Sequence, residues 1–392
     1  MDFRLTKEQV EFQEEVRDFL RTEKEKGIYT FGDNHFVHLV DKRFSKQMAK
    51  KGWIGVAWPK EYGGKGMGYI NRLILLEEMF KAGAPLGYHF LGDRQVGPGI
   101  YHSANKSLRD KFLPKILNAD IGFCVLFSEP DAGSDVASGR TTAIEEGDHF
   151  VINGQKVWTS SGHLLEYGWT LVKTNLDPDV SKYDSFSQII VDMKSPGITV
   201  SPLINAAGVH SFNEVFFDNV KVPKDNLAGE MNKGFRYTMV NLDYERAGLE
   251  RLMQNYSVKE ALIDYAKTHK RNGRPLSEDS LIRDTIAKLE IEYEVARRYI
   301  YFVASISDKG RLPNFEAAMG KTISNLFESK LADVASTILG LHGLLMPGSA
   351  EALYDGCVAD SYLWSPSYTL QGGSVEILKN IIALRGLKLA KK

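Results

Sequence analysis

The sequence has very little cysteine, no long hydrophobic run and no excess of charge of either sign. Its 392 residues include two cysteines, Cys124 and Cys357, which stand singly in apolar stretches without a CxxC pair. This argues against a disulfide framework and a thiolate metal site, so we expect two buried, unreactive thiols. Lysine and arginine total 49 against 50 acids, which leaves a formal net charge of −1. Such a balance argues against a nucleic-acid surface, which needs a cationic excess.

No run of 18 apolar residues occurs, and the start MDFRLTKEQV is neither a signal sequence nor an Arg-rich transit peptide. We therefore expect a cytoplasmic protein without membrane insertion. The composition, 43% hydrophobic and 25% charged, is ordinary for a soluble globular protein. The length allows two or three domains that share a large core.

Common motifs for nucleotides, metals and hydrolysis are missing as well. GGKGMG at 63–68 lacks the GxGxxG spacing and does not follow a strand pattern. GEMNKGFR has the glycine interval of a phosphate-binding loop, but Phe235 and Arg236 stand where Lys and Ser or Thr are required. His35 and His38 are close in sequence without an HExxH pattern or a carboxylate cluster, so we expect no metal site. GxSxG is absent too.

The first third of the chain has the spacing of helices. Thr6 with Gln9 predicts a capping box, and the apolar residues that follow recur with helical spacing at Phe12, Val16, Phe19 and Leu20. After a glycine-rich break, NRLILLEEMFKAG and SLRDKFLPKIL predict further helices. An N-terminal helical domain over residues 1–120 is expected.

From residue 121 to 230 the apolar period changes to two. Asn153-Gly154 stands between two strand-like stretches, 150–152 and 155–158, which predicts a hairpin. Further strand candidates are GWTLVKT, SQIIVDM, GITVSPL and NEVFFDNVKV. No helical stretch intervenes, so a doubly wound parallel sheet is disfavoured. We expect a central antiparallel β domain with one or two packed sheets.

Helical spacing returns after Pro223. Its clearest example is a long apolar seam at Ile282, Ile286, Leu289, Tyr293, Ala296, Ile300 and Val303. A seam of this length is typical of a bundle helix. The sequence therefore predicts an α+β multidomain fold in which residues 231–392 form a C-terminal helical bundle.

One turn, SEPDAGSD at 128–135, follows the apolar run FCVLF. A strand that ends in small, hydrogen-bonding residues offers N–H groups and hydroxyls to a flat polar ring, and Gly133 lets the backbone come close. Trp158 and Ser160 on the following strand are placed to flank the same ring. By itself, the stretch is equally an ordinary Asp- and Gly-rich loop.

Five motifs make the interpretation more specific. VLFSEPDAGSD, KVWTSSGH, FNEVFFDNVKVP, LDYERAGLERL and GGSVEILKNIIALRGL occur in one chain. In this order and approximate spacing, the sequence resembles the acyl-CoA dehydrogenases over nearly its whole length. The resemblance implies a helical domain, a β domain and a C-terminal four-helix bundle. It also implies noncovalently bound FAD and oxidation of an acyl-CoA thioester across Cα–Cβ.

The base departs from the family's commonest pattern. Many members carry a catalytic glutamate at the position that Gly372 takes in LQGGSVEIL. A minority, resembling isovaleryl- and long-chain acyl-CoA dehydrogenases, carry it in a helix sequence like LDLER, which Glu245 matches in LDYER. The resemblance implies that Glu245 removes the α-proton, with a pKa raised by an apolar site, while a hydride leaves Cβ for flavin N5. The alternative is an exposed helical glutamate. Gly372 retains its N–H, which in the family binds the thioester oxygen.

The resemblance also implies the remaining contacts. The flavin ring is expected to meet Leu126, Ser128, Trp158 and Ser160. Other FAD contacts are expected from Arg271, Gly340, Ser374 and Glu376. The CoA arm and thioester are expected to meet Ser134, Asp243, Arg246, Gly372 and Gly373. Helix capping for the serines, core packing for Trp158 and a surface ion pair for Asp243 are the alternatives.

Two of these positions depart from the family's usual motifs. Arg271 lies in THKRNGRPL, where the family usually has Arg, one residue, Gln or Thr, and then Phe-Gly. It is either an FAD pyrophosphate ligand of a neighbouring subunit or a solvated cation. Gly340 ends TILG, where the family usually has Gln and then Gly-Gly. FAD shared between subunits implies a homo-oligomer, with a tetramer expected from the family.

The substrate is the most open question. A base displaced from position 372 leaves room beside the substrate Cα, which favours branched, cyclic or bulky acyl groups. The resemblance implies an electron-transfer flavoprotein as the electron acceptor. Arg94 is either a contact to a substrate carboxylate or a buried structural arginine. Alternative functions are a flavin oxidase or monooxygenase of the same fold, and a non-catalytic scaffold paralogue.

Overall fold

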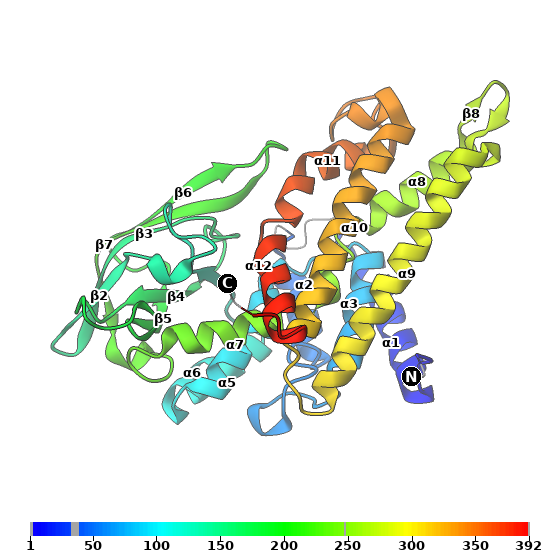
Figure 1. Cartoon of the computed structure of the whole chain (residues 1–392). Coiled ribbons are helices and arrows are strands. Elements are labelled where there is room, and N and C mark those ends of the chain that lie inside the picture. The colour runs from blue at the N-terminus through cyan, green and yellow to red at the C-terminus, as the bar shows by residue number, and fades with distance from the viewer. Residues whose placement is uncertain (1–2, 33–38, 247, 391–392) are drawn as a thin grey trace. The chain divides into compact units, whose positions relative to one another are not determined.

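The computed structural model describes residues 3–32, 39–246 and 248–390, with the backbone alone at 243–245. His35 and His38 lie outside the described residues. The chain forms two compact units. The first combines Met1–His35, Tyr69–Ala84 and Arg246–Lys392, and the second combines Phe36–Gly68 and Pro85–Glu245. The expected α+β architecture, with helices before and after a β region, is confirmed (Figure 1).

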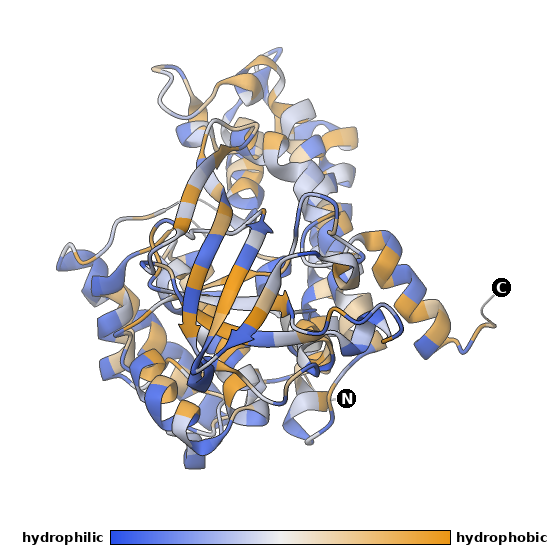
Figure 2. Ribbon diagram, turned by 90° about the vertical axis from the view of Figure 1, so that its left-hand side faces the viewer, coloured by the Kyte–Doolittle hydropathy of each residue, from blue (hydrophilic) through white to orange (hydrophobic). Residues whose placement is uncertain are grey.

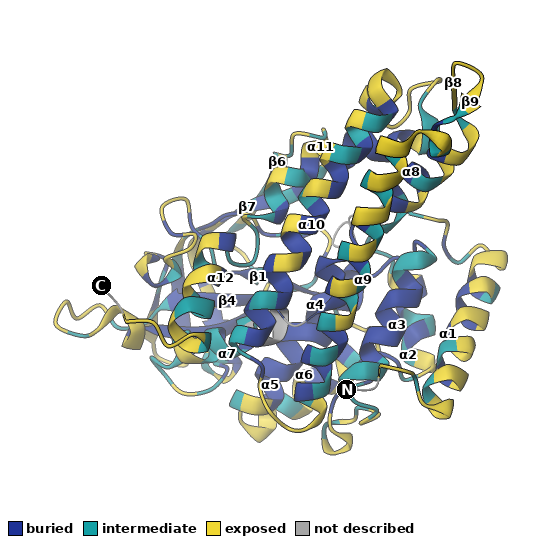
Figure 3. Cartoon of the chain, turned by 45° about the vertical axis from the view of Figure 1, so that its right-hand side comes forward, coloured by how far each residue is buried: buried dark blue, intermediate teal, exposed yellow. Residues whose placement is uncertain are grey.

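The first unit is a bundle of helices. They are α1 (Lys7–Glu25), α3 (Tyr69–Lys81), α8 (Tyr256–Thr268), α9 (Ser280–Asp308), α10 (Phe315–Leu339), α11 (Cys357–Tyr368) and α12 (Val375–Ile381), with the short strands β8 (Lys270–Arg271) and β9 (Arg274–Pro275). The predicted seam lies on α9, where its last five residues are buried. Figure 3 shows α3 almost entirely buried between α1 and α9.

The start of α1 confirms the predicted capping box. The Thr6 hydroxyl accepts a hydrogen bond from the Gln9 N–H, and the Gln9 side chain accepts one from the Thr6 N–H. Two of the four N–H groups that a helix leaves unpaired at its start are thus satisfied. The predicted apolar face of this helix, which includes Phe12 and Val16, is buried.

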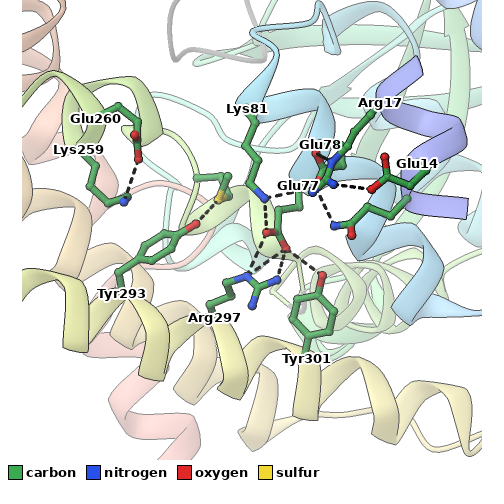
Figure 4. Close-up of polar contacts among 12 residues, drawn as sticks. Glu14, Arg17, Glu77, Glu78, Lys81, Lys259, Glu260, Tyr293, Arg297 and Tyr301 are labelled. Atoms are coloured by element: carbon green, nitrogen blue, oxygen red, sulfur yellow. Dashed lines mark hydrogen bonds and ion pairs between the residues drawn. The ribbon is translucent and has the colours of Figure 1, made fainter. Parts of the chain in front are cut away.

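A polar network ties α1, α3 and α9 together inside this unit (Figure 4). The carboxylate of Glu77 on α3 accepts hydrogen bonds from Arg297 on α9, at 2.9 to 3.1 Å, and from the Tyr301 hydroxyl at 2.9 Å. Burial opposes ionisation, but the ion pair with Arg297 outweighs it and lowers the pKa of Glu77. Neighbouring Glu78 accepts from Arg17 on α1 at 2.9 Å. Paired charges therefore determine how these helices contact one another.

In its described residues, the second unit contains a seven-stranded sheet and five α-helices. The helices are α2 (Lys42–Lys50), α4 (Gly87–Leu91), α5 (Gly97–Ser103), α6 (Lys106–Leu117) and α7 (Gly234–Arg246). The strands are β1 (Phe123–Leu126), β2 (Thr142–Glu146), β3 (His149–Lys156), β4 (Tyr167–Lys173), β5 (Phe186–Asp192), β6 (Ile198–Ile204) and β7 (His210–Pro223). The strand order is β1-β4-β2-β3-β7-β6, with β5 also paired to β4. Most neighbours are antiparallel as expected, but β1 and β2 are each parallel to β4, so the sheet is mixed.

The hairpin predicted at Asn153-Gly154 is wrong, because β3 runs straight through these residues. β3 pairs with β2 on one side and with β7 on the other, and its register against β7 shifts between Ile152 and Gly154. Gly154 has φ 141°, and a Cβ there would lie 2.6 Å from the Thr141 hydroxyl oxygen. The glycine marks an irregularity with close backbone approach rather than a turn. The real turn between β2 and β3 contains Gly147, with φ 58°.

The central strands and α7 form a continuous core. β4 and β5 are buried at every position except their ends, and Figure 2 shows long hydrophobic stretches in the sheet. On α7, the buried Thr238 hydroxyl donates to Gln188 Oε1 of β5 at 3.2 Å. Cys124 and Cys357 are both buried, as predicted, and burial raises the pKa of Cys124 to about 12. Within the described residues, no helix is long and apolar enough to cross a membrane.

Candidate active site

The SEPDAGSD turn is held by a buried ion pair. Glu129 and Ala132 exchange two backbone hydrogen bonds of 3.0 Å, which close the turn. The Glu129 carboxylate accepts from the Thr141 N–H at 3.0 Å and from the ammonium of Lys156, on β3, at 2.8 Å. Burial works toward a higher value, but the charge of Lys156 outweighs it, so the pKa of Glu129 is lowered. This acid therefore has a structural role.

The same contacts bring the predicted flavin-ring residues near one another. Lys156 also donates to the Phe127 carbonyl at 3.1 Å, and the Val157 N–H donates to the Ser128 carbonyl at 2.9 Å. Leu126, at the end of β1, directly precedes Phe127 in the chain, and Trp158 directly follows Val157. The end of β1 and the end of β3 thus meet at one place on the second unit.

The Trp158 side chain is unusually open. It is 62% exposed and meets Phe212 edge-on, with ring centroids 6.0 Å apart. Its backbone has φ 61°, a left-handed conformation that is uncommon outside glycine. Core packing, the alternative role for this residue, is therefore wrong for most of the ring. Ser160 is half-buried, and Ser134 is exposed on the turn.

Asn213 on β7 fixes the segment after Trp158. Its backbone exchanges two hydrogen bonds of 3.0 Å with Thr159, and its side-chain amide donates to the Thr159 carbonyl at 2.9 Å. The Thr159 hydroxyl is buried and has no hydrogen-bond partner within the described chain. A buried, unpaired hydroxyl beside an open indole is the kind of surface that suits a flat polar ligand. The sequence motif FNEVFFDNVKVP contains Asn213, but its spacing alone did not single the residue out.

On the first unit, the Gly372-Gly373 turn is built around a lysine. The two glycines have φ 63° and 99°, conformations that other residues adopt only with strain. Lys321 on α10 donates to the Gln371 carbonyl at 2.9 Å and also to the Gly372 carbonyl. A Cβ at Gly373 would lie 3.7 Å from the buried Arg246 guanidinium. Arg246 and Gly373, which the resemblance assigned to the substrate from two different motifs, therefore lie close together.

The remaining residues after this turn serve the start of α12. The Ser374 hydroxyl accepts the Ile377 N–H at 3.4 Å, which is a helix cap. Glu376 is exposed in the first turn, where backbone N–H groups lower the pKa of its carboxyl. The capping alternative is thus met for Ser374, and contact of either residue with FAD stays a prediction.

The predicted base lies on α7. Glu245 and Asp243 belong to this helix, but their side chains lie outside the described residues. The next residue in the chain, Arg246, is the one that reaches Gly373. Glu245 therefore directly precedes, in the chain, the residue that lies beside the diglycine turn.

Arg271 and Gly340 both lie near the end of α8. Arg271 is exposed on the β8–β9 hairpin, and Gly340 is exposed at the end of α10. Burial raises the pKa of the Tyr265 hydroxyl on α8, and the charge of Arg271 opposes that rise. The same hydroxyl lies 3.2 Å from Nδ1 of His342, two residues after Gly340. Each predicted residue thus stands two positions along the chain from a member of the ring cluster of Tyr265, His269 and His342.

Arg94 fits its structural alternative in part. It is buried, and its guanidinium lies 4.4 Å from the centroid of the Phe90 ring. In the described parts of the chain, no group of three or more His, Cys, Asp or Glu side chains is arranged to hold a metal.

Three domain models match in order: acyl-CoA dehydrogenase N-terminal domain at residues 6–120, middle domain at 124–220 and C-terminal domain at 232–387. The chain belongs to the acyl-CoA dehydrogenase family and is an oxidoreductase that acts on CH–CH groups.

Two similar proteins cover almost the whole chain. Acyl-CoA dehydrogenase FadE29 of Mycobacterium tuberculosis is 32% identical, over 99% of this chain and 98% of that protein. Glutaryl-CoA dehydrogenase of Desulfococcus multivorans is 34% identical, over 100% and 99%.

Two solved structures share the fold closely. The Tcur3481-Tcur3483 steroid acyl-CoA dehydrogenase has a TM-score of 0.89 and 27% identity, over 100% of both chains. The ChsE4-ChsE5 complex from Mycobacterium tuberculosis has a TM-score of 0.87 and 28% identity, again over 100% of both chains.

Members of this family are FAD flavoproteins. The residues present fit such a group in two respects. The exposed Trp158 ring and the unpaired, buried Thr159 hydroxyl suit a flat ring with polar edges. The diglycine turn presents backbone rather than side chains.

Proposed function

We propose that this protein converts an acyl-CoA thioester with a branched, cyclic or bulky acyl group into the 2-enoyl-CoA, with Glu245 as the base. One observation carries the proposal: the guanidinium of Arg246, the residue that follows Glu245, lies 3.7 Å from where a Cβ at Gly373 would stand, beside a Gly372 that cannot hold a proton. FAD, when bound, supplies the acceptor for the hydride from Cβ at its N5.

The chain's own residues do the rest. Glu245 takes the α-proton, and the Gly372 N–H donates to the thioester oxygen, which gains negative charge as that proton leaves. FAD contacts are assigned to Leu126, Ser128, Trp158, Ser160, Arg271, Gly340, Ser374 and Glu376. Substrate contacts are assigned to Ser134, Asp243, Arg246, Gly372 and Gly373.

The substrate class follows from the same glycine. A glutamate at this position in a family member places two methylene groups and a carboxylate next to the substrate Cα, where Gly372 has no side chain. Supporting evidence is that one of the similar structures is named a steroid acyl-CoA dehydrogenase, which implies a large ring-bearing acyl group in that protein.

The test is anaerobic bleaching of the FAD-loaded protein by a panel of acyl-CoA thioesters. We expect branched or ring-bearing thioesters to bleach the flavin faster than linear short ones. Glu245→Gln should slow bleaching by roughly 10²–10⁴-fold, the usual contribution of a general base. The matched control is Glu230→Gln, an exposed glutamate just before α7, which should bleach at the wild-type rate.

Three results separate the alternatives. An unchanged rate in Glu245→Gln removes Glu245 from the mechanism. Rapid reoxidation of the reduced protein by air identifies an oxidase or monooxygenase instead, because an electron-transfer flavoprotein would then be unnecessary as acceptor. A colourless protein that takes up no FAD identifies a scaffold.

We also propose an oligomer, with a homotetramer as the first model. Ile291 and Val295 lie one turn apart on α9 and are 64% and 58% exposed, and Leu326 on α10 is 47% exposed. The two helices pack on each other, and apolar side chains that form a contiguous exposed patch mark protein contact sites. Two similar structures are named for pairs of different chains, so a hetero-oligomer is the alternative. Light scattering on the protein purified alone separates the two.

A further inference from the structure

Lys321 is a buried charge beside the Gly372-Gly373 turn of the proposed thioester site. It lies on α10 and is 1% exposed. Its ammonium donates to the carbonyl oxygens of Gln371 and Gly372, two successive residues of the diglycine turn. Removing an ammonium from water is unfavourable by several kcal/mol before its new hydrogen bonds are counted. A neutral side chain of similar length would fill the space without that cost. We therefore expect the positive charge of Lys321 to have a function.

The geometry of one peptide links this lysine to the proposed donor. The Gln371 carbonyl and the Gly372 N–H belong to the same planar peptide unit, in which the C=O and N–H bonds point in opposite directions. A hydrogen bond that holds the carbonyl toward Lys321 therefore directs the N–H away from it. The second bond does the same for the Gly372 carbonyl and the Gly373 N–H.

The turn needs such an anchor. Gly372 and Gly373 are both in conformations with positive φ, and neither has a side chain to pack. Glycine has the largest backbone freedom of any residue, so an unanchored diglycine would sample many orientations of its N–H groups. The flanking contacts, such as the bond of 2.9 Å from the Val375 N–H to the Thr369 carbonyl, close the loop but do not touch these two peptides.

The charge adds a second effect. A cation bound to a carbonyl oxygen polarises the amide and makes its N–H a stronger donor, because hydrogen bonds in a chain reinforce one another. That gain grows as the acceptor becomes more negative, and the thioester oxygen is most negative after the α-proton leaves. Such an interaction stabilises the transition state more than the bound substrate.

We propose that Lys321 is a positioning residue for the reaction, which aims and polarises the Gly372 N–H through the Gln371 carbonyl. The proposal rests on the proposed function, in which that N–H binds the thioester oxygen. It predicts that the positive charge of residue 321, and not merely its bulk, determines how strongly the thioester carbonyl is polarised.

The test compares Lys321→Met, which keeps the length without the charge, with Lys321→Arg, which keeps the charge. Lys259→Met is the matched control, because Lys259 on α8 is also a buried lysine of this unit but bonds Glu290 at 2.8 Å. Each FAD-loaded variant receives the 2-enoyl-CoA product labelled with ¹³C at its carbonyl, which has no further oxidation to undergo. Infrared difference spectra then give the carbonyl stretch.

We expect the bound carbonyl to absorb at lower wavenumber than the free one in the wild-type protein and in Lys259→Met. Lys321→Met should lose at least half of this shift, and Lys321→Arg should restore most of it. Flavin reduction by acyl-CoA should slow roughly 10- to 100-fold in Lys321→Met, at or below the effect of deleting an oxyanion donor, while KM changes little. Without any ligand, amides in 369–375 should exchange with deuterium faster in Lys321→Met.

Three outcomes overturn the proposal. If the wild-type flavin is reduced but Lys321→Met keeps the full carbonyl shift and rate, Lys321 has no positioning role, and the proposed function stands. If Lys321→Arg loses as much shift as Lys321→Met, the effect is one of packing rather than charge. If no acyl-CoA thioester reduces the wild-type flavin, the proposed function itself fails, and this inference fails with it.

Discussion

Glu328 on α10 allows a prediction with a definite sign. The side chain is 0% exposed, and burial raises its pKa well above the ordinary value of 4.5. One carboxyl oxygen accepts the Asn255 N–H at 2.9 Å, and the other has no hydrogen-bond partner within the described residues. The folded protein therefore holds this carboxyl protonated at pH values where the unfolded chain releases the proton.

The dependence of stability on pH follows from this difference. Above pH 4.5 and up to the raised pKa, the folded state binds one proton more than the unfolded state. The free energy of unfolding then falls by about 1.4 kcal/mol for each pH unit. Glu328→Gln keeps an acceptor for the Asn255 N–H and is neutral at every pH, so it removes this slope.

The expected result is a gap between the two proteins that widens with pH. Relative to wild type, the variant should gain about 1.4 kcal/mol of stability per pH unit. For a domain of 150–250 residues this corresponds to about 3–6 °C in Tm per unit. The assay is a set of thermal melts at pH 5, 6 and 7.

Glu292→Gln is the control, since Glu292 is an exposed partner of Lys330 and meets water in both states. Its gap to wild type should stay constant over the same range. A constant gap for Glu328→Gln as well, or one that narrows as pH rises, would refute the reasoning, because Glu328 would then be ionised in the folded protein.

Two other substitutions test the two structural features described above. Arg297→Met should lower the free energy of unfolding by about 3 kcal/mol, because it leaves the buried Glu77 carboxylate without its main partner. Adding Glu77→Gln to that variant should restore part of the lost stability. Denaturant midpoints measure both effects. Equal stability of Arg297→Met and wild type would show that the ion pair between Glu77 and Arg297 does not stabilise the folded protein. Gly373→Ala should cost about 1–2 kcal/mol because of its φ of 99°, and should slow flavin reduction more than Lys259→Met does. A wild-type rate and Tm in Gly373→Ala would show that the turn tolerates a side chain.

Local patterns were enough for much of the fold. The Thr6 and Gln9 pair predicted the start of α1, because a capping box involves only residues three apart. The seam of α9 was visible because one buried face repeats at the helix period. At Gly154 the same approach failed: an Asn-Gly pair is compatible with a turn and with a bulge, and the pairing of β3 with both β2 and β7 decides between them.

The candidate site was likewise predicted from the sequence only in part. Motif order in the sequence was sufficient to name the family and to propose Trp158, Glu245 and Gly372. It did not reveal Lys321, although a single lysine inside EAAMGKTISN was an available signal for a buried charge. Its role depends on a turn 50 residues further along the chain.

By itself, the sequence determined the order of helical and β regions, that both cysteines are buried and which family the chain belongs to. These properties depend on neighbours along the chain or on the order of motifs. Only the tertiary structure decided that Glu129 pairs with Lys156, that Gly154 lies within a strand, and that Lys321 holds the diglycine turn. Each of these depends on two distant segments meeting within hydrogen-bonding distance, and linear spacing carries no information about such a meeting.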